Sequence, residues 1–275
     1  MAIMLTNTTA MNALGHLNRT NRGLTSTFGR ISSGLRINSA KDDSAGLAVA
    51  ENLQSEHQSL KQAQRNTHDG ISVIQTAEGA TQEVGDILKR MRELAVQSSS
   101  ETLANSERAY IQDEFSQLTK EVDRIAAVTE FNGIALGDNT NQKLNVQVGI
   151  QNTTNDRIAI NLGDLRGTSL QVDTGNVDLS NVASAQAALQ TIDTALDSVN
   201  SYRADYGAVQ NRLESALNNL ETYTENIASS ESRIRDADYA FETAEMSKFN
   251  IMQQAGMAIL SQANGMNQGA LRLIG

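Results

Sequence analysis

Apolar side chains recur every seven residues through two long stretches of the chain, one in each half. A seven-residue repeat keeps one side of an α-helix turned toward a partner helix. Each repeat covers about 43 residues, or roughly 63 Å of helix at 1.5 Å per residue. The pattern therefore predicts two long helices that lie together. The positions are Leu53, Leu60, Thr67, Ile74, Thr81, Leu88 and Ala95 in the first stretch, and Ile192, Val199, Tyr206, Leu213, Leu220, Ile227 and Ile234 in the second.

Both ends of the chain carry a shorter apolar stripe at alternating spacings of four and three, which predicts an amphipathic helix at each end. The first stripe contains Ala10, Leu14, Leu17, Asn21, Leu24, Phe28, Ile31 and Leu35. The last stretch carries Phe241, Ala244, Ile251, Met252, Ala255, Ile259, Ala263 and Met266. Asn21 interrupts the first stripe, and the sequence leaves two readings of it open. It either fixes the register of a helix pair or faces solvent at the helix edge.

The middle of the chain mixes structure types. One apolar face through Ile111, Phe115, Leu118, Val122 and Ile125 predicts a third, shorter helix. Strict alternation of apolar and polar residues over about 143–162 predicts a β-hairpin. Residues 163–183 are rich in Gly, Asp, Asn, Ser and Thr, and we expect them to form a short, exposed polar tip.

These elements predict a mainly α fold, a long antiparallel helical bundle or coiled coil with a small β-hairpin region. We expect residues 1–40 and 236–275 to form the two parts of an inner coiled-coil domain. Residues 41–183 and 184–235 then supply the two parts of a helical rod. Asp42 and Asp43 at the start of the first long helix read as a capping pair rather than as paired catalytic carboxylates.

Composition agrees with a bundle. Only 4% of the residues are aromatic, and the chain has no Pro, Trp or Cys. Helical bundles can be filled by Leu, Ile, Val and Ala, and uninterrupted helices require that Pro be absent. Without Cys the chain makes neither disulfides nor thiolate chemistry.

Charge is unevenly distributed. Residues 41–245 hold all 32 acidic residues and 16 of the 22 basic ones, so this segment carries a formal charge of −16. An acidic body argues against nucleic acid as a partner. No apolar window is long enough to span a membrane. The first residues lack the pattern of a cleaved secretory signal, which suits a cytoplasmic protein or export by a route that reads no such signal.

No constellation for catalysis, a metal or a cofactor is present, so we expect a structural protein rather than an enzyme. His16, His57 and His68 are scattered, and no nucleophile or phosphate-loop motif occurs. The densest basic cluster is Lys89-Arg90-Met91-Arg92, which reads first as a solvated helix face with nearby acids to pair.

Two segments resemble the signature sequences of bacterial flagellin. One is Ser32-Ser33-Gly34-Leu35-Arg36-Ile37-Asn38-Ser39-Ala40-Lys41-Asp42-Asp43, and the other is Ser232-Arg233-Ile234-Arg235-Asp236-Ala237-Asp238-Tyr239. The resemblance implies a subunit of the flagellar filament that lacks the outer variable domains. Partners would then be further copies of the chain, an export chaperone, and the hook-junction and cap proteins. The location would be outside the cell, reached without a cleaved signal peptide. Alternatives are a hook–filament junction protein or other flagellin-like axial protein, and a cytoplasmic signalling rod.

From the stripes we expect polymerisation to bury one set of terminal side chains against the other, with both ends frayed in the free monomer. This set is Leu14, Leu17, Leu24, Phe28 and Ile31 against Phe241, Ile251 and Ile259. The resemblance also implies that Arg90, Leu94 and Glu114 match positions contacted by the flagellin-sensing Toll-like receptor 5 of vertebrates.

Overall fold

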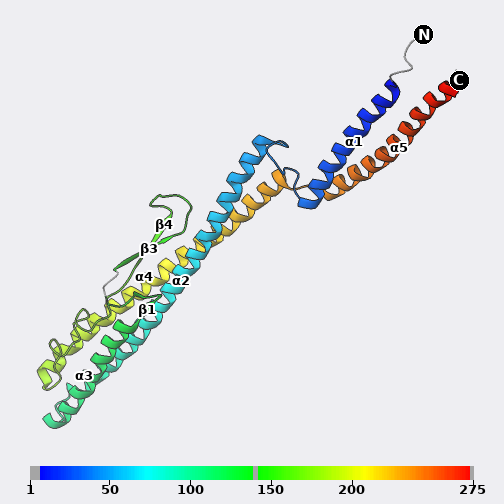
Figure 1. Ribbon diagram of the computed structural model, residues 1–275. Helices are drawn as coiled ribbons and strands as arrows, with labels where there is room; N and C mark the ends of the chain where they lie inside the picture. The colour runs from blue at the N-terminus through cyan, green and yellow to red at the C-terminus, as the bar shows by residue number, and fades with distance from the viewer. Residues whose placement is uncertain (1–6, 139–141, 273–275) are drawn as a thin grey trace. The chain divides into compact units, whose positions relative to one another are not determined.

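A computed structural model describes residues 7–138 and 142–272, with side chains up to residue 265. The helices in these ranges are α1 (Thr8–Ser33), α2 (Ser44–Ser98), α3 (Asn105–Val128), α4 (Val182–Arg235) and α5 (Tyr239–Arg272) (Figure 1). The strands are β1 (Glu130–Phe131), β2 (Ile134–Ala135), β3 (Lys143–Gln147) and β4 (Arg157–Asn161). The predicted fold class is confirmed, and α2 and α4 contain the whole of the two seven-residue repeats.

The chain divides into two compact units, residues 58–224 and residues 1–57 with 225–275. The sequence places the same kind of boundary at 40/41 and 235/236, in the connectors. In the structure the division falls inside α2 and α4, so the outermost turns of both long helices group with the terminal helices.

In the unit formed by residues 58–224, α2 and α4 run antiparallel and bury the seven-residue repeat. Ile74, Leu88, Ile192 and Leu213 are fully buried along this seam. The seam also contains the polar Thr81, whose hydroxyl donates to the Ala77 carbonyl at 2.7 Å and is thereby satisfied.

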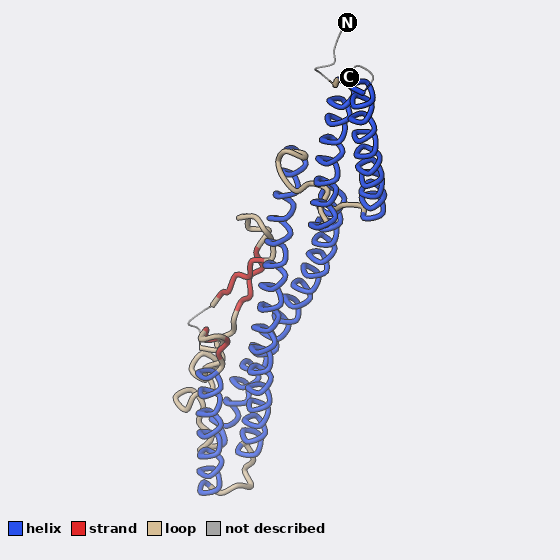
Figure 2. The backbone as a smooth tube through the Cα atoms, turned by 45° about the vertical axis from the view of Figure 1, so that its right-hand side comes forward, coloured by secondary structure: helices blue, strands red, loops and turns tan. Residues whose placement is uncertain are grey.

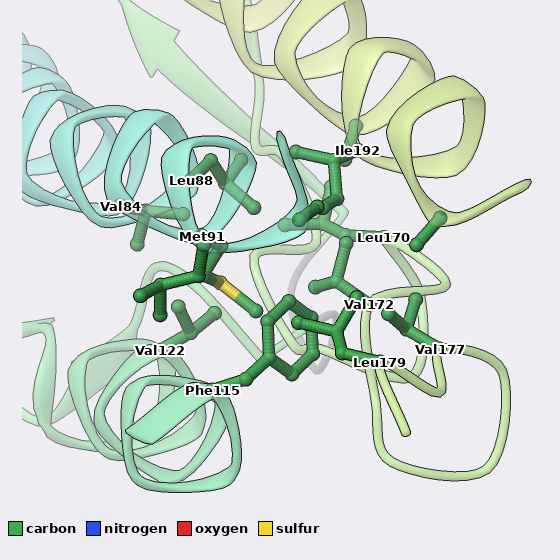
Figure 3. Packing of buried hydrophobic residues seen from close by; sticks show 14 of the residues in the cluster. Val84, Leu88, Met91, Phe115, Val122, Leu170, Val172, Val177, Leu179 and Ile192 are labelled. Carbon is green, nitrogen blue, oxygen red and sulfur yellow. The ribbon is translucent and has the colours of Figure 1, made fainter. Parts of the chain in front are cut away.

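Helix α3 packs against the same pair and closes an apolar core. Figure 3 shows Met91 of α2 and Phe115 of α3 pointing toward each other in this core, and both are fully buried. The predicted apolar face of α3 is confirmed, since Ile111, Phe115 and Val122 all lie inside.

The segment between β4 and α4 differs from its prediction as an exposed polar tip. Its apolar side chains complete the core between α2, α3 and α4 (Figure 3). They are Leu165, Leu170, Val172, Val177 and Leu179, none more than 6% exposed. Helix α3 holds the segment in place, because Asp123 accepts from the Gly167 amide at 2.8 Å and Gln112 from the Leu179 amide at 2.7 Å. The prediction of an exposed segment failed because it was based on the many polar residues of 163–183. The few apolar side chains among them are the ones that the core buries.

The predicted β-hairpin is confirmed as β3 and β4, which pair antiparallel with Leu144 opposite Ile160. Figure 2 shows it beside the long helices, and Ile158 and Ile160 pack in a cluster with Ile74 and Leu213. A second, smaller hairpin joins β1 to β2. Asn132 and Gly133 form the turn between them, and both have positive φ, as a two-residue hairpin turn of this kind requires.

In the other unit, the two connectors between helices pair with each other. Arg36 N donates to Arg235 O at 2.7 Å, and Ala237 N donates to Gly34 O at 2.9 Å. Gly34 ends α1 in the left-handed conformation, at φ 73°. Of the predicted capping pair, Asp43 accepts from the Gly46 amide at 2.8 Å and so caps α2, whereas Asp42 accepts from the Ser39 amide at 3.0 Å in the connector.

Candidate self-association surface

Helices α1 and α5 run antiparallel and side by side (Figure 1). Polar pairs join them along their length. Gln253 Nε2 donates to Asn21 Oδ1 at 2.9 Å, and Arg30 Nη1 lies 3.2 Å from Glu242 Oε1. The sequence left open whether Asn21 fixes the register of a helix pair or faces solvent. Its side-chain oxygen binds Gln253 on α5, so it acts in the helix pair.

The contact between α1 and α5 uses small and polar residues. The ring of Phe249 lies against Gly23, and Leu17 lies against Gly256. Among the described side chains of the two helices, the only fully buried ones are Thr20, Thr27, Glu242 and Ala263. No large apolar side chain is fully buried there, so the pair has little core of its own.

Within one subunit, the eight residues predicted to be buried on polymerisation are covered only in part. Leu17, Leu24 and Ile31 are half-buried at the edge of the contact. The other five are exposed: Leu14 47%, Phe28 63%, Phe241 61%, Ile251 67% and Ile259 57%.

This partial cover within the subunit has a physical reason. The α1 stripe runs beside the line of contact, which follows Thr20 and Thr27. The ring of Phe249 leaves room only for a glycine opposite it, which is Gly23, and the buried carboxylate of Glu242 pairs with Arg30. These two contacts set how α1 is rotated against α5. The stripe is therefore covered on one edge only.

The exposed side chains form apolar surface on both helices. Phe241 and Ile259 are 18 residues apart, which is five helical turns, so they share one face of α5. Met252 lies between them on that face and is also exposed. Exposed apolar surface shared by two packed helices is typical of a site that another protein surface covers.

A second candidate surface lies in the other unit, around Arg90. Arg90 Nη2 lies 2.8 Å from Glu114 Oε1, and Arg90 Nη1 lies 3.0 Å from Glu93 Oε2. The hydrogen bond to Glu114 raises the pKa of Arg90 above its ordinary value. Arg90 and Glu114 are about half exposed, but Leu94 is 1% exposed and belongs to the core. The structure therefore brings Arg90 and Glu114 together at the surface and separates Leu94 from them.

The basic cluster does not form one positive patch. Lys89 Nζ lies 2.7 Å from Asp86 Oδ1, and Arg92 Nε lies 2.6 Å from Asp193 Oδ1 on α4. With Met91 in the core, the three bases point to different acidic partners. Pairing with acids, which the sequence predicts, is confirmed.

Across the described residues, no group of three or more His, Asp or Glu side chains could hold a metal ion. Within the same residues, no helix has the length and apolarity needed to cross a bilayer.

The chain matches two family profiles over most of its length. The bacterial flagellin N-terminal helical region matches residues 4–142, and the C-terminal helical region matches residues 189–274. The chain belongs to the bacterial flagellins.

Individual relatives agree. A flagellin of Halalkalibacterium halodurans is 44% identical over 89% of both chains, and a flagellin of Bacillus subtilis is 39% identical over 98% of both. A flagellar filament core protein of Brachyspira hyodysenteriae is 40% identical over 99% of both. The crystal structure of Bacillus cereus flagellin has a TM-score of 0.50 at 32% identity, over 61% of this chain and 94% of that one.

Membership makes this chain a structural subunit of the flagellar filament, an extracellular polymer of flagellin. The alternative of a hook–filament junction protein is not favoured, because these relatives are flagellins and a filament core protein. The short form without a variable domain agrees with the near-complete overlap with these relatives.

Proposed function

We propose that the exposed apolar side chains of α1 and α5 form the contact between successive subunits of the filament. The observation that carries this is that Leu14, Phe28, Phe241, Ile251 and Ile259 are exposed although they are large and apolar. Full burial of one such side chain contributes about 1.5–3 kcal/mol. Five together supply enough to drive association once neighbouring copies cover them.

The same surface couples folding to assembly. The described part of the α1–α5 pair fully buries only Thr20, Thr27, Glu242 and Ala263. So small a core does not repay the conformational entropy of ordering two helices. The helical pair is then the form that the chain ends adopt in the filament, and frayed ends in the free subunit limit premature polymerisation.

The test places a charge on the exposed surface. Phe28→Asp and Ile251→Asp, made separately, should leave the thermal unfolding of the free subunit within about 0.5 kcal/mol of wild type, because both side chains are exposed. Each should raise the critical concentration for filament growth by about tenfold or more, measured by sedimentation and electron microscopy. Thr174→Asp, in the exposed turn before α4, is the matched control and should assemble normally. Normal filaments from both α1 and α5 variants would refute the proposal.

Before assembly, the exposed surface needs cover. A flagellar export chaperone is the partner expected to bind it in the cell, and the hook-junction and cap proteins would contact it at the two ends of the filament. Export would proceed without a cleaved signal peptide. Mass spectrometry of secreted protein tests the last point, because peptides that contain Thr6 and its neighbours should still be found in it. We assign the chain no catalytic role.

We further propose that vertebrate Toll-like receptor 5 reads the surface around Arg90 and Glu114. What supports this is the half-exposed ion pair between these two side chains. Leu94, 1% exposed, would act by supporting the helix from beneath rather than by contact. Arg90→Asp should lower receptor activation in reporter cells without loss of stability, whereas Leu94→Ala should cost about 2–5 kcal/mol of stability. Unchanged activation by Arg90→Asp would contradict the proposal.

A further inference from the structure

Methionines are concentrated at the two ends of the chain. Seven of the eight lie within residues 1–40 and 236–275, and the eighth is Met91 in α2. The seven are Met1, Met4, Met11, Met246, Met252, Met257 and Met266. Met1, Met4 and the side chain of Met266 lie outside the described residues, and Met246 is half-buried.

Exposure separates the terminal methionines from the internal one. Met11 on α1 is 63% exposed, and Met252 and Met257 on α5 are 45% and 51% exposed. Met91 is 0% exposed and lies in the core beside Phe115 (Figure 3). Met91 therefore serves as the buried control with which the oxidation of the exposed methionines can be compared.

The three exposed methionines lie on α1 and α5, the two helices whose apolar side chains are proposed for assembly. Met252 is 11 residues from Phe241 and 7 from Ile259, close to whole numbers of helical turns, so the three share one face of α5. Met257 is five residues after Met252, a rotation of about 140°, so it is exposed on another side of α5, and Met11 is exposed on α1. A change at any of them alters a surface that has to be apolar to be buried.

Oxidation is the chemistry these side chains offer. The sequence contains no Cys and no Trp, so the thioethers are its most readily oxidised groups. A peroxide, ROOH, transfers one oxygen atom to the sulfur. The peroxide O–O bond breaks, a sulfur–oxygen bond forms, the thioether loses two electrons, and the peroxide leaves as ROH. The product is a methionine sulfoxide, which is polar and accepts hydrogen bonds.

We propose that Met11, Met252 and Met257 are oxidative modification sites of the free subunit, and that their sulfoxides block its addition to the filament. This inference rests on the proposed assembly surface. A buried sulfoxide oxygen without a donor costs free energy, so modified subunits add poorly. Subunits already in the filament are protected, because the same side chains are covered by neighbouring copies.

The experiment compares wild type with a Met11→Leu/Met252→Leu/Met257→Leu variant and with Met91→Leu. Leu retains apolar bulk and cannot be oxidised at sulfur. Free subunits and preformed filaments are treated with hydrogen peroxide, oxidation at each methionine is read by peptide mass spectrometry, and the critical concentration for assembly is measured.

We expect the three exposed sites to oxidise at least about tenfold faster than Met91 in free subunits, and to be protected by a similar factor in filaments. Oxidised wild type and oxidised Met91→Leu should show a critical concentration raised by about tenfold or more. The triple variant should assemble normally with or without peroxide.

The inference is overturned if oxidised wild type assembles like untreated protein, or if peroxide inhibits the triple variant as strongly as wild type. Failure of the assembly proposal looks different. In that case Phe28→Asp and Ile251→Asp would form normal filaments, whatever peroxide does to the methionines.

Discussion

The ring of Phe249 occupies the space beside Gly23, where a Cβ atom would come within 2.6 Å of both Cε1 and Cζ. Carbon atoms do not approach that closely without displacement. Gly23 is therefore required by the packing of α1 on α5, not by its backbone conformation. The contact couples a position near the N-terminus to one near the C-terminus.

Gly23→Ala should displace Phe249 and weaken the α1–α5 pair by about 1–3 kcal/mol. Assembly should need a correspondingly higher subunit concentration, which sedimentation of filaments measures. Gly15→Ala is the matched control on the same helix. Nothing lies within 4 Å of its Cβ position, so it should gain up to about 1 kcal/mol of helix propensity. Equal assembly of Gly23→Ala and wild type would contradict the packing argument.

Tyr206 links α4 to the hairpin. Its hydroxyl accepts from the Gly163 amide at 3.0 Å, and burial raises the pKa of the phenol. Tyr206→Phe should leave that amide unsatisfied and destabilise the unit by about 1–3 kcal/mol, measured by urea unfolding. Tyr110→Phe, at a residue 75% exposed, should leave the urea midpoint unchanged. An unchanged urea midpoint for Tyr206→Phe would show that water replaces the tyrosine hydroxyl as the acceptor for the Gly163 amide.

The free energy of unfolding should depend on pH through Asp164. Arg166, 2.7 Å away, holds the pKa of Asp164 below its ordinary value. Because the folded-state pKa is the lower one, the stabilisation is fully present above the unfolded pKa of about 4 and is lost as the pH falls through the folded value.

Asp164→Asn should therefore lower the urea midpoint at pH 6, and the difference from wild type should shrink as the pH falls below about 4. Arg166→Met should behave in the same way, because it removes the partner that lowers the pKa. A difference that stays constant from pH 6 to pH 3 would exclude this pair as its source.

Arg108 closes the end of α2. It is 3% exposed, and its Nε donates to Ser98 O at 3.0 Å and its Nη1 to Leu103 O at 2.6 Å, while Nη2 donates to Ser100 O. Arg108→Met keeps the apolar stem but leaves these carbonyls without donors, so it should cost at least about 2 kcal/mol.

Arg124→Met on the same helix is the comparison for Arg108→Met. Its guanidinium pairs with Glu121 on an exposed surface, so the change should stay within about 0.5 kcal/mol. Equal effects of the two variants in urea unfolding would mean that the carbonyl contacts at Arg108 carry no stability.

The candidate site could be predicted in part. The exposed apolar residues of α1 and α5 were identified, because amphipathic spacing is a property of the sequence. How far each is covered within one subunit could not be predicted, because stripes do not specify rotation about the helix axis. That rotation depends on close contacts such as Gly23 with Phe249 and on the buried Glu242 with Arg30. The resemblance grouped Leu94 with Arg90 and Glu114, but Leu94 is buried in the core and the other two are half exposed.

The sequence by itself determined the long helices, the hairpin and their approximate ends. These depend on local periodicity and capping, in which each residue acts on neighbours a few positions away. Only the tertiary structure decided that Leu165 to Leu179 complete the core and that Phe28 and Ile251 stay exposed. Burial of those side chains depends on which segments distant in the chain come together, and a periodic pattern carries no information about that.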